Sequence, residues 1–319
     1  MMTLNDFSKK QIVFIMCNDG EKMAISNDNL VVKNPDGKIK FQITCYRLFL
    51  VCVVGNCSLT TVLLKKAKQF GFFIALMSSG FRMYAIVGAE KDGNTLLKRK
   101  QYAYHGLDIA KHITENKISN QIGNLKKVRE KSDAVTEAMD TISVYLEKIK
   151  TVDDLHELMA YEGLSSKVYF KNHFNNILWT GRHPRIKNDI INSVLDIAYS
   201  LLFAFVDALL ESFGFDIFCG VMHTQFYMRK SLVCDLVEPF RPLIDQQVKK
   251  SVNLKQITDN DFYISNHQYR LKYEKNANYV QFLMTPIIEN KDEIFKYIQS
   301  YYRSFMKESK IEDYPVFNI

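Results

Sequence analysis

Between residues 223 and 242 the sequence places one histidine and two acids among several basic residues. His223, Asp235 and Glu238 supply an imidazole and two carboxylates, which are ligands for a divalent cation. The basic residues between and after them are Arg229, Lys230 and Arg241. Arginine and lysine suit a substrate that carries phosphate groups. If one more acid joins this group in the fold, the chemistry that it predicts is metal-assisted transfer of a phosphodiester.

Glu162 interrupts a stripe of apolar residues that are placed at helical spacing. The apolar members of this stripe are Leu155, Leu158, Met159, Tyr169 and Phe170. An unpaired carboxylate on a buried face costs on the order of several kcal/mol, so Glu162 needs a cation, an arginine or a proton beside it. Two interpretations stay open: Glu162 is a metal ligand, or it is a buried acid paired with a lysine or an arginine.

The candidates in the 223–242 segment also have structural interpretations. Ser231 is a plausible N-cap, and an acid such as Asp235 in the following turn complements the helix dipole without any further role. Glu238 lies three residues on and shares its face. Since both acids lie off the apolar face of this helix, the alternative to a metal site is a solvated face joined to Arg241.

The first ~90 residues have the short apolar runs and turn signals of a small β-sandwich-like domain. The expected strands are 11–17, 22–26, 30–33, 39–44, 47–53, 72–77 and 83–87, with one helix over 60–70. We expect this β domain to span residues 1–92 and to make dimer or partner contacts. The linker is predicted at residues 91–94.

From Gly93 onward the pattern is helical and stays so, which predicts an all-α domain over residues 93–319 and an α+β protein as a whole. Residues 189–213 are apolar on most faces, as expected of a central, buried helix. Thr151 with Asp154 resembles a capping box, and Pro239 and Pro242 should interrupt the helix after Ser231. The last ~10 residues are expected to form a loose tail.

Composition excludes some classes of protein. The chain has 319 residues, 47% of them apolar, and no uninterrupted apolar run reaches the ~18 residues that a membrane span needs. Residues 1–10 are polar and lack the apolar core of a secretory signal, which favours the cytoplasm and no membrane partner. The six cysteines form no Cys-x-x-Cys pair, so we interpret them as reduced core residues.

Charge is distributed unevenly along a chain whose formal net charge is +7. Residues 98–131 hold nine Lys and Arg against three Asp and Glu, whereas residues 132–158 hold two against seven. Such a basic block often faces nucleic acid, and a solvated helix face is the alternative. The common motifs of zinc proteases, P-loop proteins, Rossmann folds and α/β-hydrolases are missing from the sequence.

Several ordered motifs together resemble the family of CRISPR-associated integrases called Cas1. The motifs are Val54-Gly55 with Ser58-Leu59-Thr60, Glu162-Gly163 with Tyr169-Phe170, Asp189 and Asn192 with Tyr199-x-Leu-Leu202, Gly220 and His223, and Ser231-Leu232 with Asp235-Leu236, Glu238, Phe240-Arg241-Pro242 and Asp245. The resemblance spans roughly residues 11–300 and is nearest to relatives from type V or type II loci. Many relatives have aspartate at the Glu238 position and a glycine between His223 and Ser231, where this chain has Met228-Arg229-Lys230.

The resemblance implies an N-terminal β domain, a helical catalytic domain, and spacer acquisition for antiviral defence. It implies a homodimer, with two dimers joined by a dimer of the small protein Cas2. By motif, the ligands of Mg²⁺ or Mn²⁺ are Glu162, His223 and Glu238, with Asp235 and Arg241 supporting them. A 3′-OH of incoming double-stranded DNA attacks a phosphodiester of the CRISPR repeat, so the enzyme is both endonuclease and integrase.

Six residues are candidates for contacts with DNA: Arg229, Lys230, Tyr169, Asn192, Arg182 and Arg185. The basic block 98–131 is expected to follow the duplex backbone. Two alternatives to the integrase stay open. One is a stand-alone, metal-dependent nuclease for branched or repair DNA that uses the same site and needs no Cas2. The other is a DNA-binding scaffold without catalysis, in which the acids have a structural role.

Overall fold

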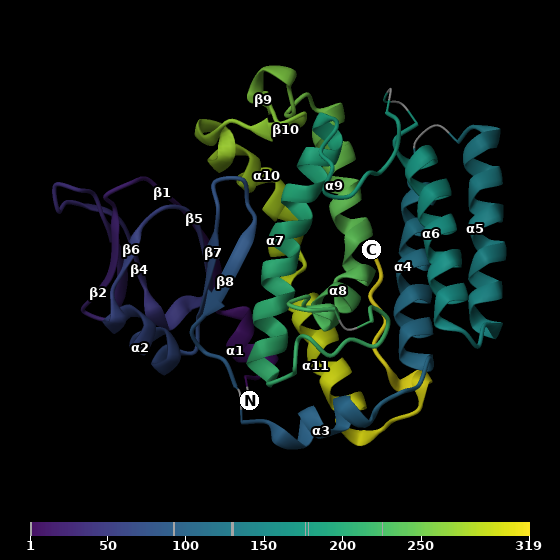
Figure 1. Ribbon diagram of the computed structural model, residues 1–319, viewed down its shortest axis with the longest axis horizontal. Helices are drawn as coiled ribbons and strands as arrows, with labels where there is room; N and C mark the ends of the chain where they lie inside the picture. The colour runs from purple at the N-terminus through teal and green to yellow at the C-terminus, as the bar shows by residue number, and fades with distance from the viewer. Residues whose placement is uncertain (1, 92, 129–130, 176, 178, 225) are drawn as a thin grey trace.

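The computed structural model describes residues 2–91, 93–128, 131–175, 177, 179–224 and 226–319, which form a β-rich part followed by a larger helical part (Figure 1). The predicted α+β fold class is confirmed. The boundary between residues 92 and 93 stays a prediction, and residue 92 in the expected linker lies outside the described residues.

The first sheet has the strand order β1-β5-β7-β8, which are Gln11–Cys17, Leu48–Gly55, Phe73–Met77 and Met83–Val87. β1, β5 and β7 run parallel, and β8 is antiparallel to β7. β5 lies inside the sheet and is buried along nearly its whole length. A strand that is covered on both faces must be apolar throughout, as its sequence Leu-Phe-Leu-Val-Cys-Val-Val is.

The second sheet has the order β4-β3-β2-β6, which are Ile39–Thr44, Asn29–Lys33, Lys22–Ser26 and Ser58–Leu59. It shares one core with α2 (Thr61–Phe70) and with one face of the first sheet. Thr60 is the N-cap of α2, because its side chain accepts a hydrogen bond from the backbone of Leu63. Two facing sheets with a helix at their core match the expected sandwich-like arrangement.

The other face of the first sheet packs against the helical part (Figure 1). Along β5, Val51 and Val53 belong to the core shared with the second sheet, whereas Leu50, Cys52 and Val54 belong to the core around α7 (Ile190–Phe213). This division follows from the period of two along a strand. The two parts of the chain are therefore joined through a common apolar core.

The helical part begins with α3 (Thr95–Ala103) and three long helices: α4 (Asp108–Lys126), α5 (Asp133–Thr151) and α6 (Leu155–His173). It continues with α7, α8 (Ser231–Leu236), a 3₁₀ turn η2 (Glu238–Phe240), α9 (Arg241–Asn253), α10 (Asn276–Glu289) and α11 (Lys291–Lys307). The short α1 (Leu4–Ser8) also packs here, since the ring of Phe7 stacks on that of Phe295 of α11 at 4.3 Å.

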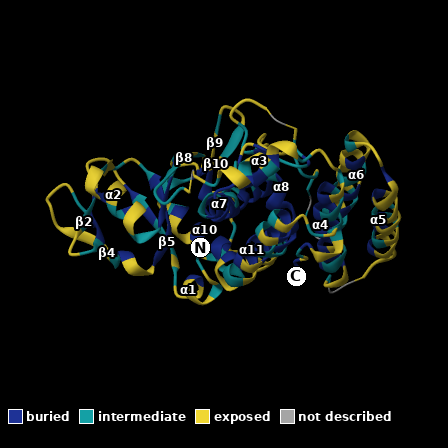
Figure 2. Ribbon diagram, turned by 90° about the horizontal axis from the view of Figure 1, so that it is seen from below, coloured by how far each residue is buried: buried dark blue, intermediate teal, exposed yellow. Residues whose placement is uncertain are grey.

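The long helix α7 is surrounded by other elements, as expected (Figure 2). It begins after Asp189, whose side chain accepts a hydrogen bond from the backbone of Asn192 at 2.7 Å. Among the described residues it is the one helix long and apolar enough to cross a membrane, and 78% of its apolar window is buried inside the protein. A cytoplasmic location stays a prediction.

Two predicted helix caps are wrong. α5 ends at Thr151, and α6 is capped by Asp154 alone, whose carboxylate accepts a hydrogen bond from the backbone of Glu157 at 2.9 Å. Ser231 lies inside the first turn of α8, and Lys230 occupies the N-cap position without a capping bond. The interruption predicted at Pro239 is confirmed, because α8 gives way there to η2 and then to α9.

The prediction of a purely helical region after Gly93 misses a β-hairpin. β9 (Phe262–Ser265) and β10 (Gln268–Leu271) pair antiparallel through a two-residue turn at Asn266 and His267. Both turn residues have positive φ, at 51° and 59°. This is the backbone that a tight hairpin requires, and asparagine tolerates it better than most residues.

Buried aromatic rings and hydrogen bonds hold the last ten residues against the helical part, so the expected loose tail is wrong. Tyr314 and Phe317 are buried. Asn116 of α4 holds Phe317 through two hydrogen bonds, from its amide to the Phe317 carbonyl at 2.7 Å and from the Phe317 backbone N–H at 2.9 Å. Asparagine side chains on α4 thus take the place of a partner strand for the end of the chain.

None of the six cysteines, all of which are among the described residues, forms a disulfide. Cys17, Cys45, Cys52 and Cys219 are buried, and Cys57 and Cys234 are half-buried.

Candidate active site

Two acids that are far apart in the sequence meet at one buried lysine. Glu162 of α6 and Glu238 of η2 both form ion pairs with the ammonium of Lys117 of α4, the second at 2.5 Å. Arg241 adds a second cation, with its Nε 2.8 Å from Glu238 Oε1. Ser166 donates a hydrogen bond to Glu162 at 2.9 Å. Two carboxylates and two cations therefore share one small volume.

This cluster fixes the charge state of its members. Burial raises the pKa of Glu238, but the charges of Arg241 and Lys117 outweigh burial and lower that pKa to about 2. Burial also works against the charge on Lys117, but Glu162 and Glu238 outweigh it and raise the pKa of the ammonium. Near neutral pH Glu238 is ionised and Lys117 is protonated.

Asparagines on α4 bring the segment that carries Glu238 against Lys117. Asn120 donates to the Pro239 carbonyl at 2.9 Å, and Asn124 donates to the Pro242 carbonyl at 2.6 Å. The residues Asn116, Asn120 and Asn124 follow one another at intervals of four, so they lie on one face of the helix. These two bonds hold η2 and the first turn of α9 against α4.

Asp235 orients the imidazole of His223. Its Oδ1 lies 2.6 Å from His223 Nδ1 and accepts the His223 backbone N–H at 2.9 Å, while Oδ2 accepts the backbone N–H groups of Val221 and Met222. With a carboxylate beside Nδ1, the proton of the neutral ring belongs on Nδ1, and Nε2 carries the lone pair. A carboxylate behind a histidine is the usual support of a metal-ligating imidazole.

Gly220 lets Asp235 reach this position. A Cβ at residue 220 would lie 2.6 Å from Asp235 Oδ2 and 2.8 Å from the Cβ of Ser231, so any other residue would displace the carboxylate. Asp235 is completely buried and Glu238 nearly so. The alternative of a solvated face for these two acids is wrong, although the predicted link from Glu238 to Arg241 is present.

The three predicted ligands have donor atoms that suit a hard divalent cation. Two of them, Glu162 and Glu238, also lie close together. Glu162 and Glu238 converge, and oxygen with imidazole nitrogen suits Mg²⁺ or Mn²⁺. His223 is near enough to lower the pKa of Glu238, although it is the smallest of the causes. In the described part of the chain, however, no three His, Cys, Asp or Glu side chains are close enough to hold one metal ion.

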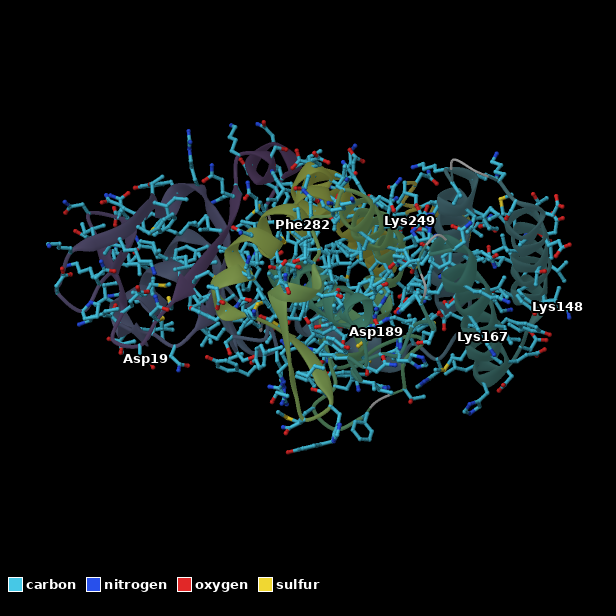
Figure 3. All side chains as sticks on the ribbon, turned by 90° about the horizontal axis from the view of Figure 1, so that it is seen from above. Asp19, Lys148, Lys167, Asp189, Lys249 and Phe282 are labelled. Atoms are coloured by element: carbon cyan, nitrogen blue, oxygen red, sulfur yellow. The ribbon has the colours of Figure 1, made fainter. Side chains whose placement is uncertain are left out.

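A cavity of about 1470 Å³ opens beside the cluster, between α6, α7, α9 and the β9–β10 hairpin. Lys117, Glu162, Glu238 and Arg241 line it, and His223 does not. Its other walls carry the basic residues Arg82, Lys167, Lys171, Arg185, Lys187 and Arg270. Figure 3 shows Lys167 well away from Asp19 of the β-rich part. Asp196 and Asp245 line the cavity as well, but lysines and arginines outnumber the acids in its lining, which suits a polyanion.

Tyr169 supports this cavity from within the core, so the prediction that it contacts DNA is wrong. The side chain is fully buried, and its hydroxyl accepts a hydrogen bond from Asn124 at 2.8 Å. Tyr199 donates a hydrogen bond to Asp245, and the Arg241 guanidinium lies 4.6 Å from the Tyr199 ring centre. Burial raises the pKa of Asp245 to about 6. These aromatic and acidic groups hold Arg241 in place.

Asn192 is likewise internal, so its predicted DNA contact is wrong, whereas Arg182 is half-buried and lines the cavity, so its DNA contact stays a prediction. Asn192 is buried and accepts hydrogen bonds from Arg182 Nη1 at 3.0 Å and from the His183 backbone at 2.8 Å. Arg182 forms an ion pair with Asp196 at 2.5 Å. Both residues shape the loop before α7. Arg185 in that loop is exposed and lines the cavity, so its predicted role stays open.

Lys230 and Arg229 also have partners inside the protein. Lys230 forms an ion pair with the buried Asp207 of α7 at 2.5 Å and is half-buried, so its contact with DNA stays a prediction. Arg229 donates from Nε to the hydroxyl of Ser231 at 3.3 Å and also to the Thr224 carbonyl. It is half-buried, and its remaining surface leaves a DNA contact as a prediction.

Sequence reasoning missed Lys117 as a member of the site. It counted this lysine only in the basic block 98–131, of which residues 129 and 130 lie outside the described residues. A signal was present, because Asn116, Asn120 and Asn124 repeat every four residues on a helix that also carries a buried apolar face. A polar stripe of this kind predicts a buried hydrogen-bonded interface. The interpretation of Glu162 as an acid paired with a lysine is confirmed as far as the pairing goes.

Residues 14–284 match the family model described as CRISPR associated protein Cas1. The chain belongs to the Cas1 family. A curated member from Thermodesulfovibrio yellowstonii, named CRISPR-associated endonuclease Cas1 1, is 28% identical over 225 residues, which cover 66% of this chain and 71% of the relative.

Solved structures share the fold of this Cas1 family member. A chain described as a Cas6-RT-Cas1–Cas2 complex has a TM-score of 0.83 at 20% identity, over 97% of this chain and 36% of that longer one. A casposase bound to integration product has a TM-score of 0.79 at 18% identity, over 97% of this chain and 96% of that one. At such identities the likeness concerns the fold alone.

Proposed function

We propose that this member of the Cas1 family is a metal-dependent DNA strand transferase that inserts short duplex DNA into a CRISPR repeat array. One observation carries the proposal: Glu162 and Glu238, which are 76 positions apart in the sequence, converge at the wall of a large basic cavity. Two acids that converge in a cavity with more cations than acids in its lining suit a phosphodiester whose neighbouring phosphates need neutralising.

The chain's own residues have distinct roles in this proposal. Glu162, Glu238 and the Nε2 atom of His223 would hold Mg²⁺ or Mn²⁺, which when bound stabilises charge on the phosphoryl and leaving oxygens. Asp235 keeps the proton of His223 on Nδ1 and so leaves Nε2 for ligation. Arg241 stays beside Glu238 and keeps that carboxylate ionised. Lys117 balances the two carboxylates and is a second cation near the reacting phosphate.

No protein nucleophile is needed in this scheme. The 3′-OH of the incoming DNA attacks phosphorus, the bond to the leaving 3′ oxygen breaks, and one phosphodiester is exchanged for another. In this proposal Arg82, Lys167 and Arg185, which line the cavity, contact the DNA backbone near that phosphate. The bulky cavity walls hold the two DNA segments in line, so the protein acts mainly by positioning and by charge.

The proposed partners are double-stranded DNA, a second copy of the chain, and Cas2. Two neighbours in fold support the DNA and Cas2 partners, since one is a Cas6-RT-Cas1–Cas2 complex and the other a casposase bound to integration product. The assembly that we propose has two dimers of this chain around one dimer of Cas2. Mass measurement of the mixed proteins, with and without DNA, would test that composition.

The decisive test is a strand-transfer assay with labelled duplex DNA, a supercoiled repeat plasmid, Mn²⁺ and Cas2. Wild-type protein should move label into the plasmid, and Glu162→Gln should reduce transfer by about 1000-fold, in line with the loss of a metal ligand or an equally important charge. Glu137→Gln, at an exposed acid of α5, is the matched control. Equal transfer by Glu162→Gln and wild type, with both folded, would remove Glu162 from the site.

A second candidate function is a stand-alone nuclease, which the name of the curated relative favours. The same residues would then direct water rather than a 3′-OH at phosphorus. The strand-transfer assay separates the two functions by its products. Fragments without joined strands, in equal yield with and without Cas2, would support the nuclease.

A further inference from the structure

Three large apolar side chains in succession project from the loop between His223 and α8. Phe226, Tyr227 and Met228 expose 72%, 88% and 74% of their surface. Single exposed apolar residues are common on proteins, but a contiguous group of this kind usually marks a binding surface. We call residues 226–229 the apolar turn. Gln225 before it lies outside the described residues.

The backbone of the apolar turn is held in a conformation that its own sequence does not favour. The Arg229 backbone N–H donates to the Phe226 carbonyl at 2.9 Å, which closes the turn. Met228 has φ of 61°, a region where a side chain costs free energy and where glycine is the usual residue. The chain thus retains a methionine where glycine would fold more easily, which points to a use for the side chain.

The described residues before and after the apolar turn are bonded to other parts of the protein. On one side Asp235 binds the backbone and ring of His223. On the other side Lys230 is bound to Asp207, and the Arg229 side chain bonds to Ser231 and lies 6.0 Å from the Phe226 ring centre. The two aromatic rings and the methionine therefore project from a turn that is anchored at Arg229 and Lys230, three to five residues after the proposed ligand His223.

We propose that the apolar turn packs against nucleobases of the DNA next to the phosphodiester that is exchanged. This inference rests on the proposed function. Because the apolar turn follows His223 by three residues along the chain, DNA whose phosphate is bound near His223 would lie within reach of the turn. Aromatic side chains stack on bases of any sequence, and apolar side chains at a bend enter between base pairs and open the stack. Arg229 beside the rings complements the charge of the adjoining phosphate.

The experiment uses a three-armed DNA that imitates a half-joined product, with 2-aminopurine at the nucleotides that flank the branch. This base changes its fluorescence when it unstacks or stacks on an aromatic ring. Wild type, Tyr227→Ala and the triple substitution of Phe226, Tyr227 and Met228 by alanine are mixed with it. The matched control is Tyr84→Ala, because Tyr84 of β8 is 64% exposed and lies outside the cavity lining.

We expect wild type and Tyr84→Ala to change the fluorescence alike. The triple variant should lose the change and bind the branched DNA about tenfold or more weakly, and Tyr227→Trp should retain the change. Met228→Gly should raise the melting temperature, because glycine adopts a positive φ without steric cost. It should also weaken binding, because it removes the contact between the Met228 side chain and the DNA. Unfolding of the triple variant is excluded by its circular dichroism, and Met228→Gly gives an independent test in a stabilised protein.

Two results would overturn the inference. One is unchanged fluorescence and affinity in the folded triple variant. The other is unchanged fluorescence together with a loss of self-association or Cas2 binding, which would assign the apolar turn to a protein partner. Failure of the proposed function looks different. If wild type joins no strands but the triple variant still loses the 2-aminopurine signal, strand transfer is wrong and the nucleobase contact stands.

Discussion

Two lysines in this protein neutralise buried acids, and the two arrangements differ in a way that separates structure from chemistry. Lys230 meets one acid, Asp207, inside the core around α7. Lys117 meets two acids, Glu162 and Glu238, at the wall of the cavity. Burial raises the pKa of Asp207 to about 6, whereas the pKa of Glu238 is lowered to about 2. Burial therefore disfavours the charged form of Asp207, whereas the cations beside Glu238 favour its charged form.

The difference teaches that a buried acid is not in itself a sign of function. Asp207 lies on a helix that is apolar on nearly all sides, and one lysine suffices to neutralise it. At Lys117 two carboxylates approach each other, which is unfavourable unless cations hold them there. Such an arrangement costs stability, and its position beside a large basic cavity gives a reason for keeping it.

The largest expected effect comes from replacing the acids that the two lysines neutralise. Glu238→Gln should lower strand transfer or DNA cleavage by about 1000-fold, because it removes a proposed ligand while keeping the shape of the side chain. Asp207→Asn should leave activity within about twofold, since Asp207 does not line the cavity. Turnover of labelled DNA by both variants measures this. An equal loss in both would mean that the two acids do not differ in function.

The next largest effect comes from replacing the two lysines themselves. Lys117→Met and Lys230→Met should each lose about 3–5 kcal/mol of unfolding free energy, because each leaves buried negative charge without its partner. Addition of Mn²⁺ should restore stability to Lys117→Met alone, since only there do two carboxylates face one point. Urea unfolding with and without Mn²⁺ measures both. A similar response of the two variants to Mn²⁺ would contradict the assignment of the metal site.

The pH dependence of stability sharpens the comparison further. Asp207 has a folded pKa of about 6 against an ordinary value of 3.8, so its contribution is complete below pH 3.8 and is lost as the pH rises through about 6. Relative to Asp207→Asn, wild type should lose ~3 kcal/mol between these pH values and then stay level. Urea unfolding across this range tests the expectation. If wild type instead gained unfolding free energy relative to Asp207→Asn as the pH rises, the charge of Lys230 would outweigh the effect of burial on the pKa of Asp207.

The smallest expected effect concerns the histidine beside the acids. Gly220→Ala would push against the Asp235 carboxylate and turn His223, so affinity for Mn²⁺ should fall by about 10–100-fold. Gly163→Ala, next to Glu162, has open space around the added methyl group and is the matched control. It should bind Mn²⁺ as wild type does. Calorimetric titration measures both, and unchanged affinity in Gly220→Ala would remove His223 from the ligands.

Local patterns predicted most of the elements because their causes are local. The seven expected N-terminal strands, the helix after Thr60 and the long helix after Asp189 all follow from hydrophobic period and from caps that bond within three residues. The hairpin at 262–271 was missed because its turn uses Asn266 and His267 rather than glycine. The loose tail was wrong because Asn116 and Asn120, about 200 positions away, supply its hydrogen bonds.

By itself the sequence determined the order of β-rich and helical parts, the family, and the acids and histidine on which chemistry could rest. Only the tertiary structure decided what those residues meet. It placed Lys117 between Glu162 and Glu238, and Asp235 beside the imidazole of His223. Four of the predicted DNA contacts also have hydrogen bonds or ion pairs within the protein: Tyr169, Asn192, Arg182 and Lys230. The physical reason is that periodicity fixes which face of a helix a side chain occupies. The partner on that face comes from a distant helix whose packing no local pattern encodes.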